Sequence, residues 1–306
     1  MRITQTMLSR NMLDTINLNR NKMNTTSIAL ATGKDVQKAS DDPVRFSQSM
    51  KFSQAIKKNE QYLRNITDAN AWIDFSIDTL TQINSKLFKA KEIATQAADG
   101  TYGEKERISL GNDVNNLLND VLDMTNSTYL GKFVFGGTFT QGDTKPFTLE
   151  EDMDQATGAP LGTYRVDYHG NDNPITRRIA ESYDIKVSIT GEEINSTSMF
   201  GSLIELRDAL NNNDVNTINA NIDILRTVSD EISNKVTNLG SNKNQIMLTQ
   251  SRLETANVNL ASYLSQTEDT DMAATIAKYS SEEMAYQVAL QATSSVINLN
   301  ILDFIR

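Results

Sequence analysis

The sequence predicts a mainly α protein with a β insert: long antiparallel helices from both termini form a bundle or coiled coil, and a small β domain lies in the middle of the chain. Three observations support this prediction. Most glycines and prolines lie within residues 131–200, apolar residues recur at heptad spacing on both sides of that segment, and the two chain ends carry opposite net charges.

The middle of the chain has the composition of a small β domain. Residues 131–200 contain 8 of the 14 glycines and 3 of the 4 prolines. Alternating β-rich runs occur at 132–135, 163–168 and 184–189, and a cluster of turn-forming residues at 169–174 separates the last two. Runs bounded by such turn clusters predict a β-rich outward domain over residues 131–200.

Both flanks have the pattern of long helices. No glycine or proline occurs between residues 44 and 98, and apolar residues there recur at steps of three and four or their multiples. Such seams are typical of helices that pack together, so we predict a helical rod domain from residues 44–130 and 201–265. The seam residues are Leu63, Ile66, Ile73, Ile77, Leu80, Leu87 and Ala94, then Leu110, Val114, Leu117, Val121 and Met124, then Ile218, Ile222, Leu225, Ile232, Val236, Leu239, Ile246, Leu253, Leu260 and Leu264, with Asn70, Asn84 and Asn257 as polar members that can fix register.

The long helix after residue 43 has a marked beginning. Ser40, Asp41 and Asp42 offer side-chain oxygens that can accept hydrogen bonds from the free N–H groups of a first helical turn. Pro43 suits the first helical position because it has no N–H to leave unpaired, and aspartates favour the positive end of the helix dipole. We therefore predict a helix cap at these four residues.

The two chain ends are predicted to pair as amphipathic helices. Residues 1–40 contain six Lys and Arg against two Asp, a net charge of +4, and residues 266–306 contain two Lys and Arg against six Asp and Glu, a net charge of −4. Exposed ion pairs contribute only ~0–1 kcal/mol each, so charge would guide the pairing more than hold it. Each end also carries an apolar stripe, made of Leu8, Met12, Ile16 and Met23 at the beginning and of Tyr286, Leu290, Ile297, Ile301 and Phe304 at the end.

The pair formed by residues 1–43 and 266–306 has an imperfect stripe. Asn19 and Thr26 occupy positions where apolar residues belong. We therefore expect the pair to be marginal in the monomer and to become ordered when further copies or partners cover it, as in folding coupled to assembly. The stripe residues are the predicted assembly interface, and the two segments are predicted to be polymerisation tails.

Composition argues against several classes of function. The chain has no cysteine, which excludes disulfides, thiol catalysis and cysteine-ligated zinc, and its single histidine, His169, cannot build a zinc site alone. A net charge of −10 argues against a general nucleic-acid binder. We find no apolar run long enough to span a membrane and no cleavable secretory signal at the polar N-terminus. No cofactor or metal is expected.

Two pairs of carboxylates each have a catalytic or metal-binding interpretation and a plainer one. Asp269 and Asp271 lack the spacing of an EF-hand loop, and a cap before the last helix is favoured. Glu282 and Glu283 are neighbours on a helix and do not face each other, so a solvated face is favoured over an acid–base pair. His169 lies in a turn cluster and is expected to be exposed and inert. Without a clustered reactive site, the chain is predicted not to be an enzyme.

Several short motifs resemble the bacterial flagellin superfamily. The N-terminal region of flagellins and their hook-associated relatives is similar to residues 1–5 (MRITQ), 30–34 (LATGK) and 39–44 (ASDDPV). The matching C-terminal element of that superfamily resembles residues 269–273 (DTDMA). The resemblance covers both ends in motif and the whole chain in layout.

Three details look more like the hook-associated members, which lie between hook and filament, than like the filament subunit. Flagellin more often has alanine after the Asp-Asp pair, whereas this chain has Pro43. The other two details are residues 131–138 (GKFVFGGT) and the ending at 300–305 (NILDFI). The resemblance therefore implies a structural adaptor subunit of the bacterial flagellum.

The resemblance also implies a set of partners. They are copies of the chain itself in a junction layer, the preceding hook-associated protein on the hook side, and the flagellin filament on the other side. Export through the flagellar type III secretion apparatus without a cleaved signal, an export chaperone on the C-terminal helix, and an extracellular location are implied too. Two alternatives stay open: a flagellin, which would assemble into open-ended filaments, and an enzyme or secreted coiled-coil effector, which would need a clustered reactive site.

Overall fold

A computed structural model describes residues 5–140, 142, 144–153 and 160–304; near the chain ends and beside the gap at 154–159 it describes the backbone alone. The chain falls into two compact units. We call Met1–Lys58 with Thr255–Arg306 the terminal unit and Asn59–Glu254 the central unit. The predicted mainly α fold with a small β insert is confirmed. The finer division into 1–43 with 266–306, 44–130 with 201–265, and 131–200 stays a prediction.

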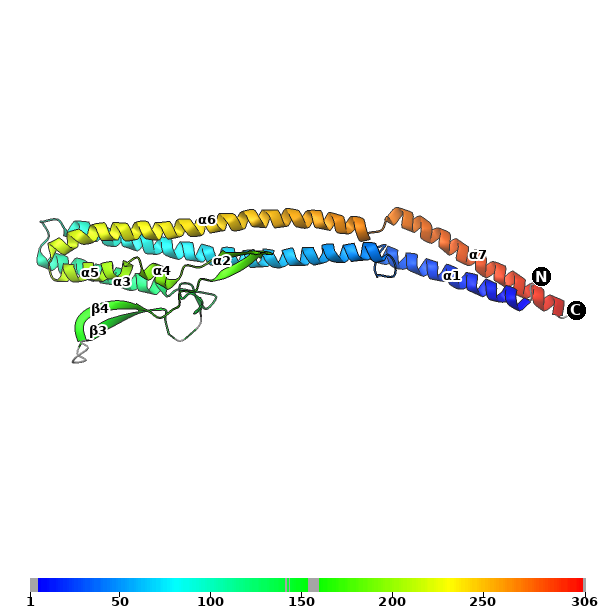
Figure 1. Cartoon of the computed structure of the whole chain (residues 1–306), viewed down its shortest axis with the longest axis horizontal. Coiled ribbons are helices and arrows are strands. Elements are labelled where there is room, and N and C mark those ends of the chain that lie inside the picture. The colour runs from blue at the N-terminus through cyan, green and yellow to red at the C-terminus, as the bar shows by residue number, and fades with distance from the viewer. Residues whose placement is uncertain (1–4, 141, 143, 154–159, 305–306) are drawn as a thin grey trace. The chain divides into compact units, whose positions relative to one another are not determined.

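Helices dominate both flanks of the sequence (Figure 1). The helix α2 has 55 residues because nothing in its sequence interrupts it, whereas α1 ends where Gly33 takes a φ of +71°. That left-handed conformation commonly closes a helix and is accessible to glycine without strain. In chain order the helices are α1 (Gln5–Thr32), α2 (Pro43–Ala97), α3 (Glu104–Thr125), α4 (Gly191–Asn195), α5 (Met199–Asn211), α6 (Val215–Glu268) and α7 (Met272–Phe304).

The β insert consists of three two-stranded antiparallel hairpins within the described residues. The predicted run at 163–168 lies inside β4, but the runs at 132–135 and 184–189 are strands only in part. Val134, Phe135, Val187 and Ile189 lie beyond the ends of the short strands and are buried in the core. The strands are β1 (Thr128–Tyr129), β2 (Lys132–Phe133), β3 (Phe147–Met153), β4 (Pro160–Tyr168), β5 (Thr176–Ala180) and β6 (Tyr183–Lys186).

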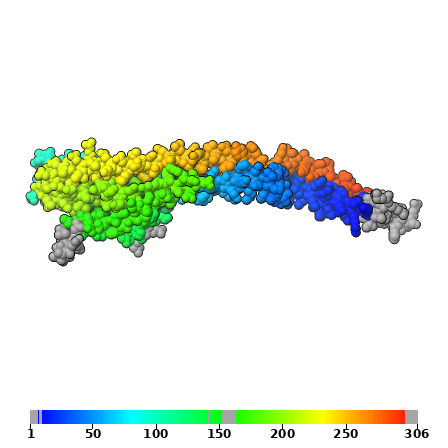
Figure 2. All heavy atoms as spheres, viewed as in Figure 1, coloured from blue at the N-terminus to red at the C-terminus, as the bar shows by residue number. Residues whose placement is uncertain are grey.

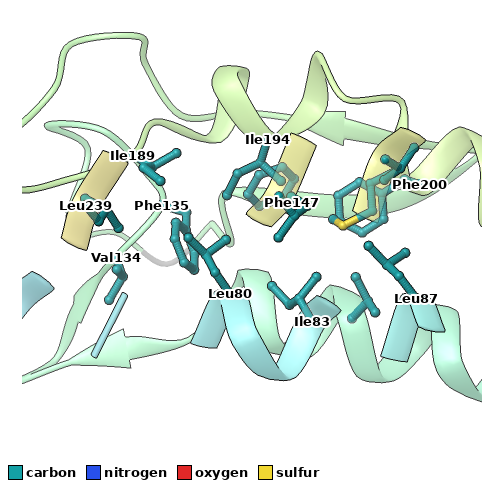
Figure 3. Close-up of a cluster of buried hydrophobic side chains, with 14 of the residues drawn as sticks. Leu80, Ile83, Leu87, Val134, Phe135, Phe147, Ile189, Ile194, Phe200 and Leu239 are labelled. Carbon is teal, nitrogen blue, oxygen red and sulfur yellow. The ribbon is translucent and has the colours of Figure 1, made fainter. Parts of the chain in front are cut away.

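The core of the central unit joins the helices to the β insert (Figure 3). Leu80, Ile83 and Leu87 of α2 are fully buried, and Phe135 and Phe147 of the insert belong to the same cluster. Burial of such side chains from water is the main favourable term in folding. Further members are Val134, Ile189 and Ile194 from the insert, Phe200 and Leu203 from α5, and Leu225, Ile232 and Leu239 from α6.

Polar residues set the register between α2 and α6 in the central unit. Asn84 donates a hydrogen bond to the Ser233 hydroxyl (3.0 Å) and accepts one from the Ser229 hydroxyl (2.5 Å). Lys243 forms an ion pair with Asp74 (2.5 Å). Later residues of α2 thus contact earlier residues of α6, as antiparallel helices require. A polar pair on an apolar seam favours one register over its neighbours.

Candidate assembly interface

The terminal unit is built on two helices, α1 and α7, that lie side by side (Figure 1). Their facing positions recur at steps of three and four, which is the spacing of one helix face. We call this line of contact the terminal seam. It consists of Met12, Ile16, Asn19, Met23 and Thr26 on α1 and of Thr275, Tyr279, Glu282, Tyr286, Ala289 and Thr293 on α7, and all are half-buried except Thr26, which is buried.

Polar groups weaken the terminal seam. The Asn19 amide donates a long hydrogen bond to the Ala285 carbonyl (3.5 Å). One carboxylate oxygen of Glu282 is buried and has no hydrogen-bond partner among the described residues. Burying a polar atom without a partner costs free energy. Glu282 therefore does not lie on a solvated face, as the sequence suggested, because its helical position places it in the seam.

Apolar side chains of both helices remain exposed. Among the side chains that the structure describes, none on α7 (residues 272–295) is buried, and on α1 only that of Thr26 is buried. In the space-filling view, α1 (blue) and α7 (orange to red) lie against each other (Figure 2). Contiguous exposed apolar surface is typical of interaction sites. The exposed residues are Met7, Leu13, Leu18 and Ile28 on α1 and Met272, Ile276, Met284, Val288 and Leu290 on α7.

The predicted interface residues fall into three groups. Met12, Ile16, Met23 and Tyr286 lie in the terminal seam. Leu290 is 43% exposed, because the seam passes through Ala289 and Thr293 and leaves the neighbouring position outside it. For Leu8, Ile297, Ile301 and Phe304 the structure gives only the backbone, in α1 and α7, and their side chains lie outside the described residues.

Sequence reasoning missed part of the seam. Thr275, Tyr279 and Ala289 did not enter the predicted stripe, although Tyr279 stands seven residues before Tyr286. That heptad interval was a usable signal. Small and polar seam residues give no such signal, because they resemble surface residues.

The connection between α1 and α2 and the connection between α6 and α7 lie together beside the terminal seam, and we call this region the joint. Residues 33–42 connect α1 to α2, and residues 269–271 connect α6 to α7. The Asp35 N–H donates to the Glu268 carbonyl (2.7 Å), and the Thr270 N–H donates to the Gly33 carbonyl (2.9 Å). Lys34 forms an ion pair with the Glu268 carboxylate (2.6 Å). The two connections are therefore hydrogen-bonded to each other, like a short antiparallel bridge.

Arg45 adds a second link across the joint. Its Nε donates to the Thr267 carbonyl (2.9 Å), and its Nη1 forms an ion pair with Asp35 (2.7 Å). A guanidinium suits this position because its fork of donors serves two acceptors at once. The sequence did not indicate a role for Arg45. Its partner Thr267 lies 222 positions away, and its partner Asp35 belongs to no recognisable motif.

Asp42 caps the N-terminus of α2, the helix that follows the joint. Asp42 Oδ1 accepts hydrogen bonds from the N–H groups of Val44 (2.9 Å) and Arg45 (3.0 Å), which is the geometry of a cap on α2, and Pro43 is the first helical residue. Asp41 Oδ2 instead accepts from the N–H groups of the preceding turn, and Ser40 is exposed.

The carboxylates and the histidine considered for chemistry have structural contacts. Asp271 Oδ1 accepts from the N–H groups of Ala273 (2.9 Å) and Ala274 (3.2 Å), so it caps α7. His169 is exposed and contacts the Thr148 hydroxyl (2.8 Å). Among the described residues, no group of three or more His, Cys, Asp or Glu is placed to hold a metal ion. None of the described helices is both long enough and apolar enough to cross a membrane.

Known protein families match both ends of the chain. Residues 3–140 match the bacterial flagellin N-terminal helical region, and residues 222–305 match the bacterial flagellin C-terminal helical region. These two regions contain α1, α2, α7 and most of α6, which carry the terminal seam and the joint. The chain belongs to the bacterial flagellin family, and the resemblance of its terminal motifs to that family is confirmed.

Within this family the chain is similar to flagellar hook-associated protein 3. It is 25% identical to that protein from Escherichia coli over 299 residues, covering 89% of each chain. Identity to the Salmonella typhimurium protein is 30% over 166 residues, which span 54% of this chain and about half (47%) of that protein. Flagellin of Bacillus subtilis is 22% identical over the full length of both chains.

Solved structures of hook-associated proteins share the fold. FlgL from Bacillus cereus superposes with a TM-score of 0.57 at 23% identity, covering 70% of this chain and 98% of that one. Flagellar hook-associated protein 3 from Legionella pneumophila superposes with a TM-score of 0.60 at 14% identity, covering 70% and 97%.

Proposed function

We propose that the chain is a structural adaptor subunit of the bacterial flagellum, which joins the hook, through the preceding hook-associated protein, to the flagellin filament. Its role is mechanical, and it has no catalytic activity. The similarity to flagellar hook-associated protein 3 over most of the chain supports this proposal.

The observation that best supports the proposal is the exposed apolar surface of the terminal helices α1 and α7. The α1–α7 pair has a polar seam and leaves apolar side chains of both helices exposed. A pair of this kind gains most of its stability only when other protein surfaces cover it. Assembly into a layer of copies, held between two partners, would provide that cover. The residues of the predicted stripes are the proposed contacts.

The proposed partners follow from the family. They are copies of the chain in the junction layer, the preceding hook-associated protein and the filament. Before assembly, the chain would pass through the flagellar type III secretion apparatus, with an export chaperone on α7, and would leave the cell without a cleaved signal. Its net charge of −10 fits neither a nucleic-acid partner nor an anionic membrane surface.

Assembly on isolated hooks tests the role. Purified chain is added to hooks that bear the preceding hook-associated protein, flagellin is then supplied, and growth is followed by electron microscopy. We expect a short layer that stops by itself and then permits filament growth. Failure of the layer to form would contradict the proposal.

Variants of α7 test the interface. Leu290→Asp places a charge on the exposed apolar face and should abolish incorporation, while Gln291→Asp, at the neighbouring exposed position, should incorporate normally. Circular dichroism and thermal denaturation should show the central unit folded in both. Normal incorporation of Leu290→Asp would exclude this face from the contact.

A second candidate function is that of flagellin itself, which the full-length similarity to Bacillus subtilis flagellin favours. The same assay separates the two, because a flagellin would grow into long filaments without added subunits of another kind.

A further inference from the structure

The terminal unit contains a small pocket beside the joint. Its volume is about 240 Å³, and its walls are formed by α1, by the connection from α1 to α2, and by the beginning of α7. Most of the residues that line it are polar. Asn24, Thr25 and Thr26 come from α1, Lys38 comes from the connection, and Lys278 comes from α7. The pocket therefore collects hydrogen-bond donors from three segments of the chain.

Two lysines of this pocket have no partner for their charge. The other charged residues of the lining, Lys34, Asp35 and Asp41, are engaged in the contacts of the joint described above. Within the described part of the chain, the side chains of Lys38 and Lys278 form neither an ion pair nor a hydrogen bond. The unpaired charges that line the pocket are therefore both positive.

A buried threonine adds a hydroxyl without a partner. The hydroxyls of Thr15, Thr25 and Thr32 on α1 each donate to the carbonyl four residues earlier, at 2.8, 3.0 and 2.9 Å. Thr26 is only 4% exposed, and its hydroxyl forms no hydrogen bond with any residue that the structure describes. Burying an unpaired hydroxyl costs free energy, which an acceptor bound in the pocket would offset.

We propose that this pocket binds an oxyanion, either inorganic phosphate or the carboxylate of an acidic side chain on a neighbouring copy. Two ammonium groups and a free hydroxyl match the negative charge and the acceptor oxygens of such a group. The pocket is smaller than the roughly 300–1,000 Å³ of typical small-molecule sites, so it suits one such group and no larger ligand. Copies of the chain can supply the carboxylate, because 39 Asp and Glu exceed 29 Lys and Arg. Only this second source rests on the proposed function.

Titration with inorganic phosphate tests the free anion. Backbone amide signals of residues 24–26 are followed by NMR, with sodium chloride at equal ionic strength as the control for screening. We expect saturable shifts with phosphate and none with the control salt. Lys38→Gln and Lys278→Gln should each weaken binding by about tenfold, because each removes a charged donor. Lys51→Gln removes the same charge from an exposed lysine outside the pocket and should leave binding unchanged.

Thr26→Val tests the buried hydroxyl separately. The substitution keeps the shape of the side chain and removes the donor, so it should weaken phosphate binding by about threefold. It should not lower the helix content in circular dichroism, because it also removes an unpaired polar group from the terminal seam. A purely structural role of Thr26 would leave the phosphate affinity unchanged.

Carbodiimide cross-linking tests the carboxylate of a neighbouring copy. The reagent joins a lysine amine to a carboxylate in contact with it, and the layer is assembled on hooks from a mixture of isotope-labelled and unlabelled chains. Cross-linked peptides of mixed isotope content that contain Lys38 or Lys278 would identify the carboxylate of another copy by mass spectrometry. Lys51 is again the matched control and should give no such peptide.

The outcomes separate this inference from the proposed function. Saturable phosphate binding that the pocket variants weaken, or cross-links between copies from the pocket lysines, supports the site and identifies its anion. Absence of both, in a layer that forms normally, overturns the site and leaves the adaptor role intact. Absence of any layer with the natural chain contradicts the adaptor role, and the phosphate titration then decides the inference alone.

Discussion

Replacing Arg107 with alanine should destabilise the central unit more than any exposed substitution. Arg107, in α3, is only 6% exposed. Its Nε donates to the Ala97 carbonyl (2.9 Å), and Nη2 donates to the Asp99 carbonyl (3.3 Å). Its Nη1 donates to the Asn213 side chain (2.6 Å) in the turn before α6. One guanidinium thus serves free carbonyls at the negative end of α2 and links them to a distant turn.

The cost of the substitution follows from these contacts. A hydrogen bond from a charged donor contributes about 1.5–3 kcal/mol, and removal of the donor leaves buried acceptors unpaired. Counting the two short bonds and giving little weight to the long one, Arg107→Ala should cost roughly 3–5 kcal/mol. In a unit of this size each kcal/mol shifts the midpoint of thermal unfolding by about 2–4 °C. A fall of about 10 °C is therefore expected.

The single tryptophan makes the assay specific. Trp72 is buried in the central unit, so its fluorescence reports unfolding of that unit and not of the terminal one. Urea titrations of the natural chain, Arg107→Ala and Arg107→Lys should show the alanine variant weakest and the lysine variant intermediate. As a control, Arg226→Ala alters an exposed arginine on α6 and should change the stability by less than about 0.5 kcal/mol. A loss below about 1 kcal/mol for Arg107→Ala would refute the reasoning.

Three further predictions concern helix ends and the terminal seam. Glu282→Leu removes the unpaired carboxylate oxygen and should stabilise the α1–α7 pair by about 1–3 kcal/mol, seen as a gain of helix in circular dichroism; a loss of helix would contradict it. Arg45→Ala should speed amide exchange at the joint, at residues 33–36 and 268–270, at a cost of about 1 kcal/mol because its ion pair is partly exposed; unchanged exchange would contradict it. Hydrogen bonds from the Thr217 hydroxyl and N–H and from the Asn216 N–H lower the pKa of Asp214, so its contribution to stability is complete above its ordinary pKa and lost as the pH falls through the lower folded value. Asp214→Asn should therefore make unfolding of the central unit less sensitive to acid below pH 3.8, the ordinary pKa of an aspartate, and an unchanged pH profile would contradict it.

The local pattern of the sequence was sufficient for the helices. Absence of glycine and proline and heptad spacing predicted α2, and the third seam predicted α6, because helix formation depends on residues three and four apart. The strands were predicted less well. Residues 147–153 form β3 although acidic residues interrupt their apolar pattern, and its pairing with β4 stabilises the strand. Residues 190–193 contain a capping box that begins α4, and this sequence signal was available.

The terminal interface was predictable in kind and only partly in detail. Complementary stripes at the two ends indicated that they pair, and Met12, Ile16 and Tyr286 do lie in the terminal seam. The sequence placed Leu290 in the same line. An α-helix has 3.6 residues per turn, so a stripe of apolar residues at heptad spacing gradually moves away from the line of contact between two helices. Here the line of contact passes through Ala289 and Thr293.

The sequence by itself determined the elements that depend on near neighbours: the long helices, the place of the β insert, and the amphipathic character of both ends. Only the tertiary structure decided which distant residues meet. Arg45 and Thr267 are 222 positions apart, and Arg107 and Asn213 are 106 apart. Such contacts depend on distances in space between segments, and no local period in the chain encodes those distances. The same holds for Lys38 and Lys278, which lie near opposite ends of the chain and line one pocket.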